Sequence, residues 1–341
     1  MYDVNDLAFA YGQPDVSGLF KVSADDFKVD EVLGFALSGE GEHQFFRIEK
    51  RGLNTEELVN RLAICIGKPI KSISYAGLKD RQALTTQWLS VHCPGEAIPD
   101  ANILHGDGWR VLETDRHLKK LKTGALEGNQ FTLVVREIRE CDAVERRLQL
   151  IKTDGVPNYF GPQRFGHNGL NMVKAEAVLL NGLRVKDRFL RGIYYSAARS
   201  FLFNRILSAR VASHNWNKAV SGDVMQLAGK NSIFPIEVPD DIINARVDAQ
   251  DLSPASLMWG KGHDRVRADA LVLQQTALQG FEPWCVALEN HGLERAYRAH
   301  VLQVQDLVWQ WQEGGLILTF QLTSGSYATS VLREVIQPFT I

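Results

Sequence analysis

The stretch KSISYAGLKDRQALTTQWLSVHC, residues 71–93, predicts a strand, a glycine-led loop and a second strand. The loop carries Asp80 between two cations, Lys79 and Arg81. Adjacent positive charge favours the ionised form of a carboxyl group, and the strands hold both ends of the loop. We therefore expect a fixed carboxylate, which suits a nucleophile or an electrostatic stabiliser better than a proton donor. An ordinary surface charge paired with its neighbours is the competing interpretation.

Outward from this stretch, the first ~150 residues alternate strand and helix patterns. Strands are predicted at residues 27–32, 44–48 and 129–138, and the last pattern is the strongest because β-branched and aromatic residues dominate it. A helix is predicted to begin at Asn54, where Glu57 would complete a capping box. This half of the chain therefore predicts a sheet with flanking helices.

Helical periods dominate residues 155–300, for example at 172–180 and 197–211. Strand patterns return at residues 301–311 and 316–322. A sheet, then helices, then a sheet again suggests that one domain is inserted into another.

Composition bounds the class of protein. The chain has 341 residues, of which 45% are hydrophobic and 23% charged, enough for two globular domains. Its net charge of −2 means that any nucleic acid must bind through a local basic region. The four cysteines are too scattered for a disulfide framework or a structural zinc site. Without an apolar leader or a membrane-length apolar run, we expect a cytoplasmic protein.

Three aromatic residues, Phe27, Phe131 and Tyr327, lie near strand starts or glycine-rich turns. They either pack in a core, which is the commoner role, or form a stacking platform for a flipped base. Asn129 lies two residues from Phe131 and would share its face of the strand. Its amide either reads a base edge or belongs to a turn after Gly128.

Several cations are candidates for contacts with an RNA backbone, because neutralising phosphates with such side chains drives nucleic-acid binding. Solvated loops are the competing interpretation, and for Arg164 a packed hinge at residues 158–166. Lys21, close to the strand of Phe27, is a further candidate cation, and it is assigned to substrate binding. The backbone candidates are Lys79, Arg81, Lys119, Lys120, Lys122 and Arg164.

Six motifs occur in one order along the chain and together resemble the TruD family of tRNA pseudouridine synthases. No single motif is highly specific, but their joint occurrence is implausible by chance. The motifs are DFKV with Glu31 (residues 26–31), AGLKDRQA (76–83), GALEGNQF (124–131), PNYFGPQRFG (157–166), SAARS (196–200) and GSYATS (325–330).

The resemblance implies an α+β fold. A catalytic domain with a mixed, mostly antiparallel sheet is expected at residues 1–154 and 302–341. A mainly helical α/β insertion is expected at 155–301. The implied reaction converts uridine to pseudouridine at position 13 of the tRNA D-arm, without a cofactor or a metal.

The resemblance also places Asp80 on the family's catalytic aspartate and Phe27, Asn129 and Phe131 on active-site positions. Tyr327 aligns with a substrate-contacting aromatic that is often Phe in relatives. A carboxylate can act at C1′ as in glycoside hydrolysis, or on the uracil ring; both routes stay open. A tRNA-binding or folding protein, and a nucleoside hydrolase that uses Asp80, are the alternative functions.

Overall fold

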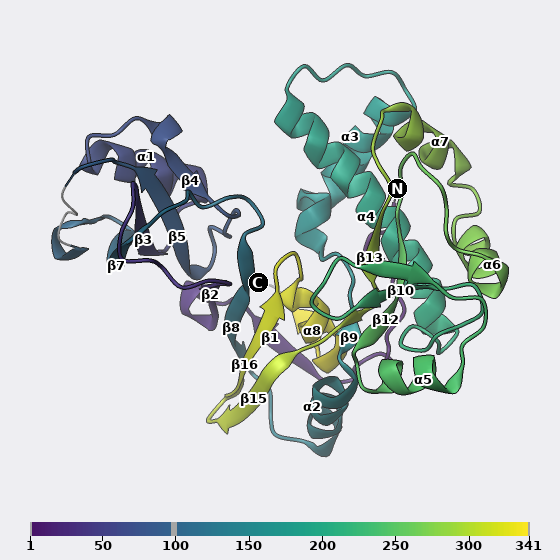
Figure 1. Cartoon of the computed structure of the whole chain (residues 1–341). Coiled ribbons are helices and arrows are strands. Elements are labelled where there is room, and N and C mark those ends of the chain that lie inside the picture. The colour runs from purple at the N-terminus through teal and green to yellow at the C-terminus, as the bar shows by residue number, and fades with distance from the viewer. Residues whose placement is uncertain (1, 97–100, 340–341) are drawn as a thin grey trace. The chain divides into compact units, whose positions relative to one another are not determined.

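The computed structural model of the chain describes residues 2–96 and 101–339 (Figure 1). It contains two compact units. We call the first the helical unit; it comprises the residues up to Asp15, Arg146–Gln303 and Ser326–Val335. We call the second the sheet unit; it comprises Val16–Glu145, Val304–Gly325 and the residues from Ile336. The division into a catalytic domain and an insertion stays a prediction.

The sheet unit is built on a large mixed sheet, which confirms the predicted α+β class. Among the described residues its strands follow the order β15-β16-β8-β2-β5-β3-β7-β6, with β1, β4 and β17 attached at the side. Pairing is antiparallel except between β2 and β5 and between β1 and β17. The bounds are β1 Ser17–Phe20, β2 Phe27–Leu33, β3 His43–Lys50, β4 Ile73–Tyr75, β5 Leu84–His92, β6 His105–Gly106, β7 Trp109–His117, β8 Leu126–Arg136, β15 Gln305–Gln312, β16 Gly315–Thr323 and β17 Gln337–Phe339.

Helix α1 (Thr55–Cys65) covers part of this sheet. Asn54 caps it and Glu57 completes the capping box, as predicted. Its buried residues, among them Leu58 and Leu62, pack in one core with Phe46 of β3. The residues after the helix form a short 3₁₀ turn (Ile70–Ser72) that leads into β4 and the Asp80 loop.

Strand β8 lies between β2 and β16 in the middle of the sheet unit. It begins at Leu126, three residues earlier than the predicted strand. Asn129 faces Glu31 of β2 and Leu322 of β16, while Phe131 faces Val29 and Phe320. A Cβ atom at Gly128 would lie 2.2 Å from the carbonyl oxygen of Leu322, so close pairing with β16 requires glycine there.

The helical unit has a core around α4, a helix of 25 residues that contributes Ala198, Leu202, Phe203 and Leu207. Helix α2 begins in the sheet unit and continues into this one. The unit also contains the sheet β11-β10-β12-β13 and the pair β14-β9. The helices are α2 Asp142–Asp154, α3 Leu170–Leu179, α4 Arg188–Ala212, α5 Asp241–Asp248, α6 Ala268–Ala277, α7 Glu282–Asn290 and α8 Ala328–Val335; the strands are β9 Val156–Pro157, β10 Val224–Leu227, β11 Ile233–Pro235, β12 Leu252–Met258, β13 Ala296–Ala299 and β14 Val301–Leu302.

The structure corrects the sequence interpretation at three places. The four strands β10 to β13 were not predicted, because they are short and β12 contains Pro254, which weakens a strand pattern. Helix α4 begins at Arg188, well before the predicted residue 197. The strand expected at residues 301–311 is two strands, and β15 has a register shift where Asp306 adopts a positive φ of 51°.

Within the part of the chain that the structure describes, no helix has the length and apolar character needed to cross a membrane.

Candidate active site

Asp80 lies in the loop between β4 and β5 of the sheet unit, where hydrogen bonds to its side chain and to its main chain hold it. One carboxylate oxygen, Oδ2, accepts from Lys21 Nζ at 2.6 Å, and Oδ1 accepts from the main-chain N–H of Gln82 at 2.9 Å. Its main-chain carbonyl accepts from Lys50 Nζ at 2.9 Å. The side chain keeps 21% of its surface exposed, so the carboxylate is fixed yet reachable.

Lys21 joins Asp80 to an aromatic cluster. It follows β1 directly and adopts a left-handed backbone with φ of 60°. Its Nζ lies 4.2 Å from the centre of the Phe27 ring, a cation–π distance, while it pairs with Asp80. The carboxylate, the ammonium and the ring therefore form one group.

The two cations beside Asp80 in the sequence point elsewhere, which corrects the expected electrostatics of the loop. Lys79 pairs with Glu31, with Nζ and Oε1 2.7 Å apart. Arg81 donates from Nε to the carbonyl of Gly52 at 2.9 Å. The ammonium paired with the carboxylate comes from Lys21, 59 residues away.

The Phe27 ring of this group belongs to a cluster of three phenylalanine rings from neighbouring strands. Phe131 stacks on Phe320 with ring centres 5.5 Å apart and an angle of 25°. Phe27 lies 6.1 Å from Phe131 in a tilted arrangement. All three rings are buried, so they form a rigid, dry apolar block. Core packing and a stacking platform are both compatible with this arrangement.

Asn129 belongs to a network of buried polar groups. Its side-chain oxygen accepts from Lys79 Nζ at 3.0 Å, and Lys79 pairs with the buried Glu31. Glu31 also accepts from the main-chain N–H of Trp88 at 2.7 Å. Burial raises the pKa of the Glu31 carboxyl, and the charge of Lys79 opposes this. Among the described residues, the side-chain N–H₂ of Asn129 donates no hydrogen bond.

Tyr327 and Arg164 lie in the helical unit, where the hydroxyl of Tyr327 accepts from Arg164 Nε at 3.0 Å. Phe160 packs beside both, 5.9 Å from the Tyr327 ring. Arg298 stacks over the same phenylalanine at 4.1 Å, and burial lowers its pKa to about 10. These residues form a second group of aromatic and cationic side chains, in the helical unit.

The basic run lies between β7 and β8. Lys119, Lys120 and Lys122 are all exposed there. Within the described residues, none of the three side chains makes a hydrogen bond or an ion pair. Arg81 is also exposed, with Nη1 4.0 Å from Glu57. These four cations are therefore accessible to a ligand, whereas the Lys79 ammonium is almost enclosed.

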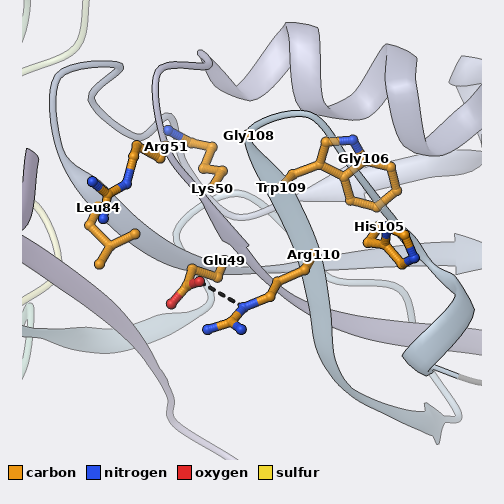
Figure 2. A pocket seen from close by; sticks show the side chains of 9 residues that line it. All are labelled: Glu49, Lys50, Arg51, Leu84, His105, Gly106, Gly108, Trp109 and Arg110. Atoms are coloured by element: carbon orange, nitrogen blue, oxygen red, sulfur yellow. Dashed lines mark hydrogen bonds and ion pairs between the residues drawn. The ribbon is translucent and has the colours of Figure 1, made fainter.

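A pocket of about 410 Å³ opens at the end of β3 in the sheet unit (Figure 2). An ion pair between Glu49 and Arg110, 2.8 Å long, lies along it. None of the site residues predicted from sequence lines it. The lining residues are Glu49, Lys50, Arg51, Leu84, His105, Gly106, Gly108, Trp109 and Arg110.

Two residues of the group around Asp80 were not identified as site residues from sequence, Lys50 and Glu31. The sequence pattern of β3 could have identified Lys50, because alternate residues of a strand share a face. Lys50 lies on the same buried face as Phe46 and Ile48. Glu31 was part of a quoted motif, but nothing in the motif indicated its pairing with Lys79. In the described parts of the chain, no three His, Cys, Asp or Glu side chains lie together as metal ligands would.

Comparisons with known proteins agree with one another. The family model for tRNA pseudouridine synthase D (TruD) matches residues 3–182 and 170–335. The tRNA pseudouridine synthase D of Legionella pneumophila (strain Lens) is 47% identical over 338 residues, which cover 99% of this chain and 100% of that protein. The enzyme of the same name from Methylococcus capsulatus is 43% identical, covering 98% and 95%.

The fold is also similar to a crystal structure described as that of a tRNA pseudouridine synthase D from Methanosarcina mazei. The TM-score is 0.74, and the match covers 98% of this chain and 96% of that one. The two sequences are 20% identical, so this likeness concerns the fold.

Proposed function

The chain belongs to the tRNA pseudouridine synthase D (TruD) family, and on this premise we propose that it isomerises uridine to pseudouridine in tRNA. The proposed target is uridine 13 of the D-arm, and the proposed nucleophile is Asp80. The observation that carries the proposal is the Asp80 carboxylate, held by Lys21 beside buried phenylalanine rings and still partly exposed.

Asp80 would act on a nucleotide turned out of the RNA stack. In one route its carboxylate bonds to C1′ while the C1′–N1 bond breaks and the electron pair leaves with uracil. Uracil then rotates, C5 bonds to C1′ and the carboxylate is released. C5 loses its proton and N1 gains one, so the product is an isomer of the substrate. Attack on the uracil ring is the alternative route.

The Lys21 contact supports a fixed direction of attack. The Lys21 ammonium holds Oδ2 while the main-chain N–H of Gln82 holds Oδ1, so the carboxylate cannot rotate freely. A pre-positioned reacting group lowers the entropic part of the barrier. We therefore propose that Lys21 orients Asp80, in addition to the substrate contact inferred from sequence.

The detached base must be retained and kept away from water. Phe27 and Phe131 would supply an apolar surface for it. Asn129 would read its edge: its oxygen is already occupied by Lys79, so it would offer N–H donors to a uracil carbonyl. On this arrangement Lys79 positions Asn129, and its enclosed ammonium is less suited to a phosphate.

Tyr327 is proposed as a further substrate-contacting aromatic, from its place in the family motif. The exposed cations Arg81, Lys119, Lys120 and Lys122, together with Arg164, are proposed to contact the RNA backbone.

The test is Asp80→Asn, with Asp25→Asn as a matched control because Asp25 is an exposed carboxylate in an ion pair with Arg51. We expect Asp80→Asn to lose modification of a tRNA transcript while retaining tRNA binding, and Asp25→Asn to keep both. Turnover near the unmodified protein's in Asp80→Asn would overturn the catalytic role of Asp80.

Product analysis separates isomerisation from hydrolysis. Mass spectrometry should show modified RNA of unchanged mass and no free uracil. Release of uracil with an abasic site would instead indicate a nucleoside hydrolase. Site-resolved mapping of tRNA from cells with and without the protein then tests position 13, because the signal there should disappear without the protein.

A further inference from the structure

Lys50, the last residue of β3, is a buried lysine beside the candidate nucleophile. Its side chain is 1% exposed and among the largest fully buried side chains of the described residues. Lysine is almost never fully buried unless its charge is paired. Within those residues, no carboxylate oxygen lies within ion-pair distance of its ammonium. Filling space in the core does not require a charged side chain, so a lysine at residue 50 needs another reason.

The ammonium of Lys50 is taken up by main-chain carbonyls. It donates to the carbonyl of Leu53 at 2.7 Å and to that of Asp80 at 2.9 Å. Leu53 lies in the connection from β3 to α1, and Asp80 lies in the loop before β5. One side chain thus ties a strand end, a helix entry and the Asp80 loop together. Figure 2 shows it directed away from the Glu49–Arg110 pair.

Burying the Lys50 ammonium is energetically unfavourable, because its charged form loses contact with water. Burial lowers the pKa of Lys50 to about 8, and the nearby Asp80 carboxylate opposes this. The other charged groups that act on it are Lys79 from the loop, Glu57 from α1 and Glu31 from β2. A methionine would fill similar space without a buried charge. The lysine therefore provides something that an apolar side chain cannot, which is a pair of charge-assisted hydrogen bonds to the loop.

The neighbouring residue of the loop is also anchored. The main-chain N–H of Lys79 donates to Thr55 Oγ1 at 2.9 Å, and Thr55 donates to Gln87. The loop is thus held at successive residues, at the N–H of Lys79 and at the carbonyl of Asp80. Lys21 and Gln82 hold the Asp80 side chain. Lys50 holds the Asp80 main chain, through its carbonyl.

We propose that Lys50 is a positioning residue, which holds the Asp80 main chain so that the carboxylate faces Lys21 and the reacting nucleotide. The proposal rests on the proposed function, because it presupposes that Asp80 reacts. Lys50 acts through Asp80 and does not touch the substrate. When the ammonium loses its proton, these hydrogen bonds lose their charge assistance and the loop is held less firmly.

The first experiment replaces Lys50 with Met, with Lys71→Met as a control at an exposed lysine of the same unit. A misplaced reacting group costs on the order of 100-fold in rate, so kcat of Lys50→Met should fall by about that factor. Its KM and Kd for tRNA should stay within about twofold, because ground-state binding is untouched. Lys71→Met should leave all three unchanged. An unchanged kcat in a folded Lys50→Met would overturn the proposal.

The second experiment uses Lys50→Arg and does not depend on Lys50→Met folding. The guanidinium stays protonated throughout the alkaline range. We expect kcat of the unmodified protein to decline above about pH 8, where Lys50 titrates, and the decline to be absent in Lys50→Arg. The same alkaline decline in both would place it in the substrate or another group and contradict the proposal.

The two failures can be told apart. If Asp80→Asn retains turnover, Asp80 is not the nucleophile, and the proposed role of Lys50 loses its premise. If Asp80→Asn is inactive while Lys50→Met is fully active, only the role of Lys50 fails.

Discussion

The ion pair of Asp80 and Lys21 in the sheet unit contrasts with that of Asp223 and Arg210 in the helical unit. Arg210 binds both carboxylate oxygens of Asp223, at 2.7 and 3.0 Å, and both side chains are 3% exposed. Arg210 also donates to the carbonyls of Asn215 and Lys218. Lys21 instead holds one oxygen of Asp80 and leaves that side chain 21% exposed.

The difference separates a structural ion pair from one suited to reaction. A bidentate, enclosed pair satisfies its own hydrogen bonds and presents nothing to a ligand. A partly open carboxylate with one cation on one oxygen can still meet a reacting atom. Acidity alone does not distinguish the two aspartates; the exposure of the carboxylate and the geometry of its contact with the cation do.

The largest expected effect comes from Asp80→Asn, which should reduce turnover by about 10³-fold or more if Asp80 is the nucleophile. Its free energy of unfolding should change by less than about 1 kcal/mol, because the pair is partly exposed. Turnover measurements and denaturant unfolding check the two parts. A large loss of stability would mean that Asp80 belongs to the same class as Asp223.

Asp223→Asn should show the opposite pattern. Removing one partner of a buried ion pair leaves the other charge uncompensated and costs about 3–5 kcal/mol. Denaturant unfolding measures this cost, and turnover of the protein that remains folded should be retained. A stability change below about 1 kcal/mol would remove the contrast between the two pairs.

Lys50 predicts a dependence of stability on pH. Its pKa is lowered from 10.5 to about 8 in the folded chain, so between these pH values the unfolded chain binds the additional proton. Its contribution to the free energy of unfolding therefore rises with pH across this window, by at most about 3 kcal/mol. Lys50→Met should lack this rise. Denaturant unfolding of both proteins between pH 7 and about pH 10 measures the difference; parallel curves would contradict it.

Lys21→Met removes the cation of the partly exposed Asp80–Lys21 ion pair. Loss of the contact that orients Asp80 should lower kcat by roughly 10- to 100-fold, with less than about 1 kcal/mol of destabilisation. Arg210→Met, the matched change in the closed pair, should destabilise the chain by several kcal/mol. Equal losses of stability in Lys21→Met and Arg210→Met would show that the two ion pairs do not differ in their structural role.

The smallest effect is expected from exposed cations whose side chains make no hydrogen bond or ion pair in the described part of the chain. Replacing Lys119, Lys120 and Lys122 with Ala should weaken tRNA binding and flatten its salt dependence by up to about three log units per log unit of salt. Stability should be unaffected, since these side chains are exposed. Binding isotherms at several salt concentrations measure the slope, and an unchanged slope would place them outside the RNA contact.

The sequence predicted the helices and strands that are specified by residues close together in the chain. The capping box of Asn54 and Glu57 fixed the start of α1, and the β-branched run of β8 predicted its strand. Strand β12 escaped prediction because it is buried along nearly its whole length and so shows no alternation. The early turns of α4 contain Gly192, which weakens a helix pattern.

At the candidate site, sequence could place Asp80 in its loop but could not name its partner. Lys79 and Arg81 are its neighbours in the chain, yet side-chain direction sends them to Glu31 and Gly52. Lys21 reaches Asp80 through the packing of β1, β8 and β2, which no local pattern encodes. Partners that depend on long-range pairing are the part that single-sequence reasoning misses.

That long-range pairing has a consequence for how the protein matures on the ribosome. Strand β1, which leads directly into Lys21, pairs in register with β17 from Ser17 and Gln337 onward, more than 300 residues later in synthesis. Phe320, which stacks on Phe131, is likewise translated long after it. The sheet therefore cannot close co-translationally from its amino-terminal half, and a stalled nascent chain would hold Asp80 without the completed surroundings described above. Contacts of this span also slow folding, so the surroundings of Asp80 are completed only after the last strands of the sheet have been synthesised.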